Sequence, residues 1–443
     1  MLKIAYHTVG CRLNQVETIG TIASFHSLDI KEVPFNTIAD IYIINSCTVT
    51  ESSHNKSLKA VRQAITLNPK SIVVAAGCAV SYNPESFLNI PGISLIVGAQ
   101  NKEDIFQEVF KRIEQDKKGK IKEKRVTIHE RTTIPAYPFV EKKYPKRTRA
   151  YLKIQDGCHL SCAFCVVTVV RGNAVSYKKE DIIAQTQKLI DLNYKEIVLT
   201  GVNLGSFSFD NKIKAVAFDD ERKSEIQTLL EELLKLGGDV RFRLSSINPE
   251  DINKKLIDFM DTEKRICKHL HISIQSGSDT ILRQMKRPYK KKRIIEIFNH
   301  FQKSRNSFGI GSDILLGFPG ETEEDFRETY RFIEENPFTY LHVFPFSARK
   351  KTKADSMEGK VKESVIQKRV KELKKLAEKK KENYLKSFIG KKLEVIFETK
   401  KEGKLTGTSS NYLKVKSSSK DVQVNSLATV HINALEKGCL IAH

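Results

Sequence analysis

The stretch 156-DGCHLSCAFC-165 contains three cysteines, Cys158, Cys162 and Cys165, within eight residues. It follows a short apolar run, AYLKI, that predicts a β-strand, so the cysteines lie in a loop at the end of that strand. Thiolates at this C-x3-C-x2-C spacing suit a cubane iron–sulfur cluster, in which each of the iron atoms needs a ligand. Zinc is the alternative, with His159 as the fourth ligand, although adjacent Cys158 and His159 reach one ion only awkwardly. The spacing therefore predicts a cluster in which the protein leaves one iron without a ligand.

The composition predicts a globular protein with a polyanionic partner. The chain has 443 residues, of which 40% are hydrophobic, and contains no apolar run long enough to span a membrane. It carries 75 Lys and Arg against 53 Asp and Glu, and this net charge of +22 favours nucleic acid as the partner over an anionic membrane. Eight cysteines are too few for a disulfide scaffold, so metal or redox roles come first. The start, MLKIAYHTVG, lacks the features of a signal peptide, and we therefore expect a cytoplasmic protein.

Residues 1–115 have the pattern of a doubly wound α/β domain. Four apolar runs predict buried parallel strands, namely KIAYHT, DIYIIN, SIVVAA and SLIVG. Helical periodicity follows the first two runs, at about residues 14–28 and 52–67. A further amphipathic helix is predicted to begin at Asn101, a residue type that favours helix N-termini.

A longer alternation of strands and helices occupies residues 146–386, after a charged linker at 116–145 with one strand at RVTI. Six runs predict parallel strands, namely AYLKI, EIVLT, VRFRL, HLHISI, IGSDILLG and LHVFPF. This number of βα units suits a partial (β/α)6 barrel. The segment 361–386 predicts one long basic helix, whose apolar stripe consists of Ile366, Val370, Leu373 and Ala377.

Residues 387–443 change to short alternating strands separated by Gly, Asn and Ser. The runs are KLEVIFET, GKLTGTSS, NYLKVKSS, SLATVHINAL and GCLIAH. They predict a small antiparallel β-barrel. Its basic side chains favour an RNA-binding module over a barrel whose charges serve no particular partner.

A second set of three cysteines is spread over the first domain but converges once the strands are placed. Cys11, Cys47 and Cys78 each follow one of the first three predicted strands. The carboxyl ends of parallel strands meet at one edge of the sheet, where open α/β sheets have their ligand sites. Gly10 and Gly77 precede two of the cysteines and allow the backbone to approach a bulky inorganic group. The alternative, three independent buried cysteines, does not explain why all three lie at the same edge.

These features resemble the radical S-adenosylmethionine superfamily, in which a C-x3-C-x2-C loop follows the first strand of a partial barrel and an aromatic residue, here Phe164, precedes the last cysteine. The preceding three-cysteine domain and the terminal barrel resemble the methylthiotransferase family, whose terminal barrel is a TRAM domain. The resemblance implies two 4Fe–4S clusters, with S-adenosylmethionine bound at the open iron of the second triad. It further implies that cleavage of S-adenosylmethionine gives a radical that removes hydrogen from the substrate, and that the first triad's cluster supplies or carries sulfur.

Five stretches resemble the branch of this family that acts on threonylcarbamoyladenosine in tRNA. They are 8-TVGCRLNQVET-18, 45-NSCTVTESSHNKS-57, 199-LTGVNLGS-206, 269-HLHISIQSGSDTIL-282 and 341-LHVFPFSARKKTKA-354. That resemblance implies methylthiolation at C2 of the modified adenosine next to the anticodon, with the tRNA anticodon arm and an external electron donor as partners of a monomeric enzyme. The alternatives are isopentenyladenosine in tRNA, an aspartate of a ribosomal protein, and a non-catalytic RNA-binding protein with structural clusters.

The resemblance and the barrel pattern also assign individual site residues, because active-site side chains of such barrels lie at the carboxyl ends of the strands. Cofactor-binding positions are predicted at Phe164, Thr200, Gly201, Asn203, Ser245, Ser246, Gln275 and Asp313. The serines and Gln275 have capping or turn formation as the alternative. Substrate-binding positions are predicted at Arg171, Asn14 and Glu17, with an ordinary surface role as the alternative for Arg171. No side chain is assigned as the catalyst, because the clusters and S-adenosylmethionine carry the chemistry.

Three further segments have no settled role at this level. The Lys-rich stretches 117–125 and 286–293 are either solvated surface or RNA contacts, and the sequence does not choose between them. The segment 206–223 resembles a surface insertion.

Overall fold

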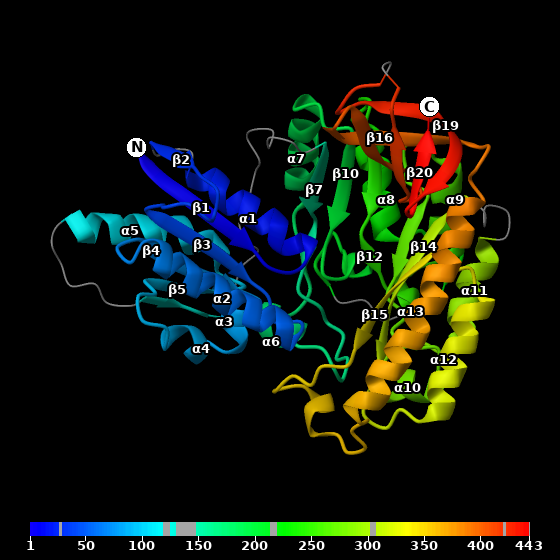
Figure 1. The fold of residues 1–443 in the computed structure, drawn as a ribbon, viewed down its shortest axis with the longest axis horizontal. Helices are drawn as coiled ribbons and strands as arrows, with labels where there is room; N and C mark the ends of the chain where they lie inside the picture. The colour runs from blue at the N-terminus through cyan, green and yellow to red at the C-terminus, as the bar shows by residue number, and fades with distance from the viewer. Residues whose placement is uncertain are drawn as a thin grey trace. The chain divides into compact units, whose positions relative to one another are not determined.

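The structure, a computed structural model, describes residues 1–25, 29–117, 125–129, 148–212, 219–301, 307–419 and 422–442. The chain divides into two compact units, shown as a ribbon in Figure 1. The first unit comprises Met1–Glu141, Asp156–Tyr177 and Arg349–Thr352, and the second comprises Lys142–Gln155, Lys178–Ala348 and Lys353–His443. Both cysteine triads therefore belong to the first unit.

A parallel six-stranded sheet forms the centre of the first unit. Its strand order is β2-β1-β3-β4-β5-β6, and every neighbouring pair is parallel. The strands are β1 (Leu2–Thr8), β2 (Ile30–Glu32), β3 (Ile41–Ser46), β4 (Ile72–Gly77), β5 (Leu95–Gly98) and β6 (Arg125–Thr127). Every residue of β3, β4 and β5 is buried, as is typical of parallel strands covered on both faces.

Helices cover both faces of this sheet. One face packs against α1 (Arg12–Ser24) and α5 (Ile105–Lys117), with Ile22 and Ile105 in the shared core. The other face packs against α2 (Glu51–Leu67), α3 (Cys78–Tyr82) and α4 (Glu85–Leu88). These two cores confirm the predicted doubly wound α/β fold.

Local differences from the predicted pattern occur near the ends of the sheet. The short strand β2 was not predicted, because three largely exposed residues give no clear alternation. The strand predicted at RVTI is present as β6 and pairs with β5, so the sheet extends into the segment predicted as a linker. The rest of that linker, 118–124 and 130–145, lies outside the described residues.

Asn101 does not cap a helix with its side chain, which corrects the prediction for this residue. Its Oδ1 atom instead accepts a hydrogen bond from the backbone N–H of His129, at 3.1 Å. A 3-10 turn, Lys102–Asp104, precedes α5. The side chain thus contributes to a tertiary contact that the local sequence could not indicate.

The second unit begins with parallel strands that match the six predicted runs, together with one short strand, β12, that was not predicted. They form two sheets, in the orders β11-β10-β7 and β12-β13-β14-β15. The strands are β7 (Arg149–Lys153), β10 (Glu196–Thr200), β11 (Arg241–Leu244), β12 (Ser246–Ile247), β13 (His269–Ile272), β14 (Gly309–Leu316) and β15 (Tyr340–Pro345). Within each sheet all pairs are parallel, which confirms the predicted class of a parallel, partial (β/α) barrel.

Helices alternate with these strands. They are α7 (Lys179–Asp191), η3 (Leu204–Ser206), α8 (Glu225–Leu234), η4 (Pro249–Asp251), α9 (Lys254–Thr262), α10 (Asp279–Gln284), α11 (Lys291–His300), α12 (Glu323–Glu335), η5 (Lys353–Ser356) and α13 (Glu363–Lys386). The remaining short elements are β8 (Gln155–Asp156), α6 (Val167–Arg171) and β9 (Val175–Ser176).

The long basic helix is present as α13 (Figure 1). All four residues of its predicted apolar stripe are buried, which confirms the face that it turns to the core. A Cβ atom at Gly317 would lie 2.4 Å from Ile366 Cγ1, so the turn after β14 needs a glycine to let this helix approach. Gly317 also has a φ of +81°, which glycine adopts without strain.

A closed five-stranded barrel ends the chain, in the order β16-β17-β18-β20-β19. Its strands are β16 (Lys392–Lys401), β17 (Lys404–Ser409), β18 (Lys414–Ser417), β19 (Leu427–Glu436) and β20 (Cys439–Ala442). Side chains such as Val395, Val415 and Leu440 fill its core. The predicted barrel is confirmed, except that β18 and β20 pair in parallel instead of antiparallel.

Two buried arginines attach this small barrel to the parallel strands of the same unit. Arg241 Nη2 donates to the carbonyl of Thr408 at 2.8 Å, and Arg243 donates to the carbonyls of Ser409 and Ser410 at 3.0 and 2.8 Å. Glu196, fully buried between the two guanidinium groups, accepts hydrogen bonds from both. Burial alone would raise the pKa of this carboxyl, but Arg243 and Arg241 hold it well below its usual value.

Candidate functional site

The first cysteine triad lies at the carboxyl ends of three adjacent strands. Cys11, Cys47 and Cys78 follow β1, β3 and β4, which are neighbours in the sheet. A Cβ atom at Gly10 would lie 2.6 Å from both Cβ and Sγ of Cys47, so the first two loops touch. Burial raises the pKa of the Cys47 thiol, and the nearby sulfurs of Cys78 and Cys11 raise it further, against a backbone hydrogen bond at Val49 that lowers it. The structure thus brings the three sulfur-bearing loops together, as the strand pattern predicted.

Hydrogen bonds fix the three loops to one another. Asn14 Nδ2 donates to the carbonyls of Val9 and Ser46, at 2.8 and 3.0 Å, and so joins the first loop to the second. Ser46 Oγ donates to the carbonyl of Ala76 at 2.6 Å and accepts from the N–H of Ala79 at 3.2 Å, which joins the second loop to the third. The loops that carry the cysteines are therefore joined by buried hydrogen bonds, with Cys47 and Cys78 buried and Cys11 exposed.

The second triad occupies one loop of the first unit. The N–H groups of Leu160 and Val167 point at the sulfurs of Cys158 and Cys165, each at 3.4 Å. Such N–H to sulfur contacts stabilise thiolates, the form in which cysteine binds metal. The loop begins at Gly157, where a Cβ atom would lie 2.0 Å from the carbonyl oxygen of Asn173. Only a glycine allows this close return of the chain.

A buried arginine joins the two cysteine-bearing regions. Arg171, on the helix that follows the second triad, donates to Glu17 Oε1 and Asp156 Oδ1 at 2.7 and 2.9 Å. It also donates to Asn14 Oδ1 at 2.7 Å and to Glu17 Oε2 at 3.2 Å. Burial alone would lower the pKa of this guanidinium, yet the charges of Cys78, Glu17 and Asp156 raise it well above its usual value. Arg171 is therefore permanently charged, with carboxylates around it.

Lys102 completes this cluster of charges and was not predicted as a site residue. Its Nζ atom contacts Glu17 Oε2 and lies 3.4 Å from Asn14 Oδ1, and the side chain is buried. Two positive groups, Arg171 and Lys102, thus balance two negative ones, Glu17 and Asp156. No sequence signal identifies Lys102, because it lies 88 residues from Asn14.

The three residues predicted to bind substrate are thus found in contact with one another. Arg171, Asn14 and Glu17 use their polar groups within the first unit, and each is buried. This gives them a positioning role between the two triads that the sequence did not indicate. Direct contact with substrate stays a prediction.

Most of the predicted cofactor-binding residues lie at strand ends of the second unit. Thr200 and Gly201 are at the end of β10, Ser245 and Ser246 follow β11, and Gln275 follows β13. Gln275 has a φ of +70°, a strained conformation for a residue other than glycine and one that is frequent at functional sites. Ser245 Oγ is buried and has no hydrogen-bond partner among the described residues, so it is available to a ligand. Phe164 lies in the first unit, between Cys162 and Cys165.

Asn203 is held by residues that were not predicted. Gln155 Oε1 accepts from the N–H groups of Val202 and Asn203 at 2.9 and 3.1 Å, and Asn203 Nδ2 donates to Asp251 Oδ2 at 3.0 Å. Removal from water, and then the charge of Glu250, raise the pKa of Asp251 to about 7. This carboxyl therefore changes its protonation state near neutral pH.

Asp313 differs from the other predicted cofactor residues in its position. It lies inside β14, three residues before the strand ends, whereas the other predicted residues of this unit lie at strand ends or in loops. Its carboxylate contacts His271 and His342, which lie on the two neighbouring strands. Binding of cofactor by Asp313 stays a prediction.

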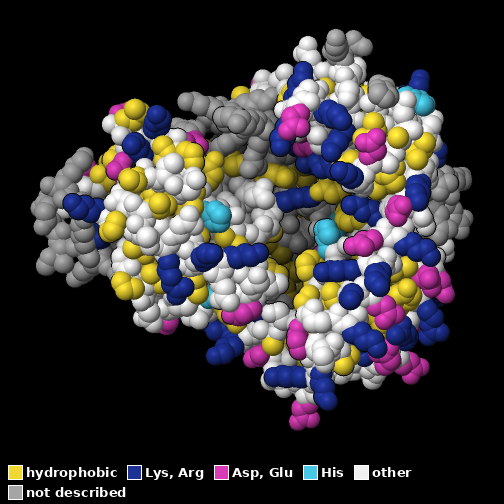
Figure 2. Space-filling model, in the orientation of Figure 1, with side chains coloured by type: hydrophobic (Ala, Val, Ile, Leu, Met, Phe, Trp, Pro, Cys, Tyr) yellow, Lys and Arg dark blue, Asp and Glu magenta, His cyan; other side chains and the backbone are white. Residues whose placement is uncertain are grey.

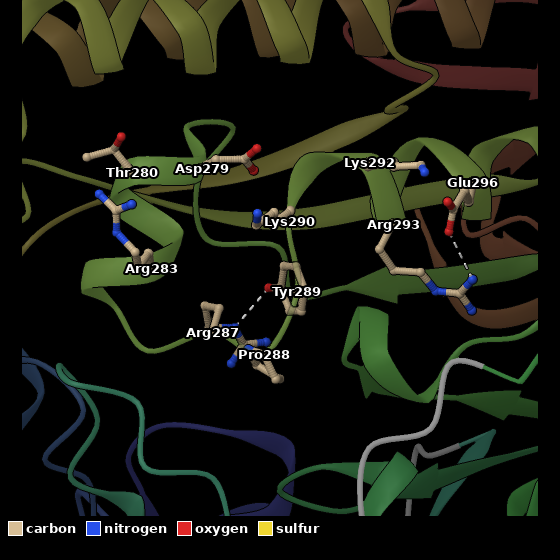
Figure 3. A pocket seen from close by; sticks show the side chains of 10 residues that line it. All are labelled: Asp279, Thr280, Arg283, Arg287, Pro288, Tyr289, Lys290, Lys292, Arg293 and Glu296. Carbon is tan, nitrogen blue, oxygen red and sulfur yellow. Dashed lines mark hydrogen bonds and ion pairs between the residues drawn. The ribbon is translucent and has the colours of Figure 1, made fainter.

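A basic pocket of about 750 Å³ lies beside α10 and α11 (Figure 3). Its lining includes five Lys or Arg side chains and two acidic ones, from Asp279 to Glu296. Arg287 is buried and donates to the carbonyl of Ser273 and to Asn248 Oδ1, at 3.2 and 2.9 Å, so it fixes the wall. Arg283, Lys290 and Lys292 are exposed around the opening. The pocket lining thus includes most of the Lys-rich stretch 286–293, with the exception of Lys286 and Lys291.

The described part of the segment 206–223 contacts the wall of this pocket. Asp220 accepts from Arg293 Nη2 at 3.0 Å, and Asn253 Nδ2 donates to the carbonyl of Arg222 at 2.6 Å. Residues 213–218 lie outside the described part of the chain.

Comparison with known proteins identifies the relatives of this chain. Residues 152–333 match the family model of the radical SAM superfamily, and residues 3–98 match one described as uncharacterized protein family UPF0004. A threonylcarbamoyladenosine tRNA methylthiotransferase, MtaB, of Bacillus subtilis (strain 168) is 36% identical over 422 residues, which cover 94% of this chain and 90% of that protein. The chain belongs to the radical S-adenosylmethionine methylthiotransferase family.

Further comparisons agree with this family. The protein of the same name from Aquifex aeolicus (strain VF5) is 35% identical, over 89% of this chain and 92% of its own length. Among solved structures, the radical S-adenosylmethionine methyltransferase TsrM from Kitasatospora setae superposes with a TM-score of 0.57, over 80% of this chain and 74% of that one. At 11% identity this last likeness shows the fold alone.

Membership of this family implies a 4Fe–4S cluster and S-adenosylmethionine as cofactors, and the residues present fit both. The loop of Cys158, Cys162 and Cys165 offers three sulfurs, two of which face backbone N–H groups. The partnerless hydroxyl of Ser245 and the strained backbone of Gln275 are features that a bound ligand would account for. None of the helices in the described ranges has the length and apolar character that a membrane span requires.

The buried charge cluster predicts a large effect of removing its centre. Replacing Arg171 with Met leaves Glu17 and Asp156 buried without their main partner, and such uncompensated charge costs about 3–5 kcal/mol. We therefore expect Arg171→Met to lower the free energy of unfolding by this amount in urea denaturation. Arg62→Met, on the exposed side of α2, is the matched control and should change it by less than about 0.5 kcal/mol. A small loss for Arg171→Met would show that the cluster is not held by charge.

The raised pKa of Asp251 predicts a pH-dependent stability. A carboxyl whose pKa in the folded state lies above its usual value favours folding fully at low pH, and this contribution is lost as the pH rises from about 4 to about 7. One such group changes stability by up to about 1.4 kcal/mol per pH unit in that range. Asp251→Asn keeps an oxygen for Asn203 and should flatten the dependence, measured as urea midpoints at several pH values. Asp258→Asn, on α9, is the control, and an unchanged slope in Asp251→Asn would contradict the assignment.

Proposed function

We infer that this chain is a tRNA methylthiotransferase that converts threonylcarbamoyladenosine next to the anticodon to its 2-methylthio derivative. The observation that carries this inference is the similarity to the Bacillus subtilis enzyme over 94% of the chain. The two matching family models, over residues 3–98 and 152–333, contain the two cysteine triads. The choice of substrate is further supported by the five sequence stretches quoted above, which resemble that branch. The net charge of +22 agrees with an RNA substrate.

The two triads have different proposed tasks. Cys158, Cys162 and Cys165 would hold the cluster that binds S-adenosylmethionine, and Cys11, Cys47 and Cys78 would hold a second 4Fe–4S cluster that supplies or carries sulfur. A reduced cluster with bound S-adenosylmethionine supplies a radical that removes hydrogen from carbon. The chain's own residues keep the sulfurs in place. Asn14 and Ser46 fix the loops of the first triad, and Arg171 connects that framework to the loop of the second.

The remaining parts of the proposal concern partners. All six cysteines of the triads are assigned as ligands, so we propose that electrons come from a donor outside the chain. Because both triads lie in one unit of one chain, a monomer is sufficient for the reaction. A tRNA substrate makes the cytoplasm the proposed place of the reaction.

The two triads predict separable losses of function. Cys158→Ala should abolish reductive cleavage of S-adenosylmethionine to 5′-deoxyadenosine, because it removes a ligand of the cluster proposed on the second triad. Cys47→Ala should preserve cleavage and lose insertion of the methylthio group into tRNA. Both are measured in anaerobic assays, by chromatography for 5′-deoxyadenosine and by mass spectrometry of tRNA nucleosides. Cys439→Ala, outside both triads, is the control and should resemble the unmodified protein.

The outcomes distinguish the alternatives. Retained insertion in Cys47→Ala would exclude a sulfur role for the first triad, and absence of cleavage in the unmodified protein would favour a non-catalytic RNA-binding protein. A deletion strain should lack the 2-methylthio derivative of threonylcarbamoyladenosine. Loss of the isopentenyl derivative instead would identify the other tRNA branch.

We also propose that the basic pocket beside α10 and α11 binds the phosphate backbone of the tRNA. Lys and Arg are spread over the visible face of the second unit, with Asp and Glu between them, so charge alone does not define a site (Figure 2). The pocket differs because three exposed basic side chains, Arg283, Lys290 and Lys292, surround one concave opening (Figure 3). Phosphate contacts of this kind supply affinity without base specificity.

Charge reversal in the pocket is expected to weaken tRNA binding. The triple variant Arg283→Glu, Lys290→Glu and Lys292→Glu should raise the Kd for an anticodon stem-loop at least tenfold. The slope of log Kd against the logarithm of the salt concentration should also fall by about 1 for each phosphate contact that is lost. Fluorescence anisotropy at several salt concentrations measures both. Lys374→Glu, Lys375→Glu and Lys379→Glu, on the exposed face of α13, form a control with the same charge change. Equal losses in the two triple variants would refute a specific role of the pocket.

A further inference from the structure

Three potential metal ligands converge on neighbouring strands of the second unit. His271 lies on β13, Asp313 on β14 and His342 on β15. His271 Nε2 is 3.1 Å from Asp313 Oδ2, and His342 Nδ1 is 3.2 Å from Asp313 Oδ1. One ligand atom from each residue lies within 4.8 Å of the others. None of these residues belongs to either cysteine triad.

The strand register produces this convergence. Asp313 pairs directly with His342, and His271 pairs with Gly311, two residues before Asp313 on the same face of β14. The neighbouring residue Val343 points to the opposite face and is buried. Residues of alternating orientation therefore place the two imidazoles on either side of one carboxylate.

A tyrosine hydroxyl orients His271 from its other side. Tyr340 Oη lies 3.1 Å from His271 Nδ1 and 2.8 Å from His269 Nε2. A Cβ atom at Gly311 would lie 2.0 Å from Tyr340 Cζ, so the glycine leaves the space that this ring occupies. Histidines that bind metals commonly use their second ring nitrogen in such a hydrogen bond.

The hydrogen-bond chain leaves a place for a cation between His271 and Asp313. If Tyr340 donates its proton to His269, it accepts one from His271 Nδ1, and neutral His271 then has no proton on Nε2. The unprotonated Nε2 then lies 3.1 Å from a carboxylate oxygen of Asp313, and the lone pairs of the two atoms repel each other. A cation bound by both atoms would remove this repulsion. If Tyr340 donates to His271 instead, a proton on Nε2 takes the place of the cation.

The ligands are also accessible. The His271 side chain is 8% exposed, Asp313 28% and His342 54%, so the group opens on one side. Phe344, the next residue of β15 on this face, is also exposed. A metal ion held here would retain positions for water or for an oxygen-bearing ligand.

We propose that His271, Asp313 and His342 bind a divalent transition-metal ion, in addition to the cofactors of the proposed function. Two imidazoles and one carboxylate are a donor set that suits Fe²⁺, Co²⁺, Ni²⁺ or Zn²⁺, and they leave open coordination positions. The site is unlike the cysteine triads because it offers nitrogen and oxygen ligands only. Its competitor is a metal-free chain in which both imidazoles donate protons to Asp313. In this metal-free chain, burial would raise the pKa of Asp313, but hydrogen bonds from the two imidazoles hold it well below its usual value.

Binding of Co²⁺ to the holoenzyme tests this site. The protein carries its clusters in the oxidised, EPR-silent state, so that their cysteines are occupied, and Co²⁺ alone is added anaerobically. We expect one Co²⁺ per chain, with an EPR spectrum of the high-spin ion and couplings from imidazole nitrogens. Asp313→Asn and His342→Gln should each weaken binding at least tenfold. His342 is more than half exposed, so its substitution leaves the fold intact.

A matched control is available in the same unit. His300 and Asp220 form a histidine–carboxylate pair at 3.4 Å, and the group of three convergent ligands described above does not include them. His300→Gln should leave the Co²⁺ signal unchanged. Absence of a bound ion with imidazole couplings, or equal binding in His342→Gln and His300→Gln, would overturn the proposal in favour of the metal-free chain. Neither result depends on methylthiotransferase activity, so this test fails or succeeds independently of the proposed function.

Discussion

The first unit depends on the burial of four charges that must balance one another. Arg171 and Lys102 face Glu17 and Asp156 in a region without access to water, where any one of them alone would be strongly unfavourable. Because each group comes from a different element, the balance exists only when α1, β8, α6 and the 3-10 turn before α5 have all assumed their positions. The interaction thus specifies one arrangement of the unit. Cys11 and the three cysteines of the second triad lie close in sequence to its members Glu17, Asp156 and Arg171.

Hydrogen bonds to backbone carbonyls likewise fix the arrangement of the loops around the first triad. Asn14 and Ser46 bind carbonyl groups next to the cysteines, so residues of the first unit itself fix the loops that carry the sulfurs. Gly10 and Gly77 permit the close approach, with φ values of +98° and +102° that other residues adopt only with strain. The loops therefore have little freedom before any inorganic group binds.

Sequence patterns predicted the parts of this structure that depend on local periodicity. Apolar runs located β3, β4, β10 and β14, and the position of cysteines after strands predicted that the first triad converges. The buried ion cluster could not be predicted, because Arg171 and Glu17 are separated by 154 residues. No local sequence pattern around either residue indicates that the two side chains form an ion pair. The same limit applies to Asn101, whose partner His129 lies beyond α5. Short elements such as β2, and the parallel pairing of β18 with β20, depend on tertiary contacts instead of on an alternating pattern.

The attachment of the terminal barrel has a consequence for how this chain tolerates change. Arg241 and Arg243 bind carbonyl oxygens of Thr408, Ser409 and Ser410, atoms that every amino acid possesses. These carbonyl contacts do not depend on which side chains the three residues carry, although Ser410 Oγ adds a contact by accepting from the N–H of Lys268 at 2.9 Å. Glu196, Arg241 and Arg243, in contrast, use their own charged groups and have no equivalent replacement. The attachment of the barrel therefore depends on the three buried charged residues more than on the side chains of the barrel itself.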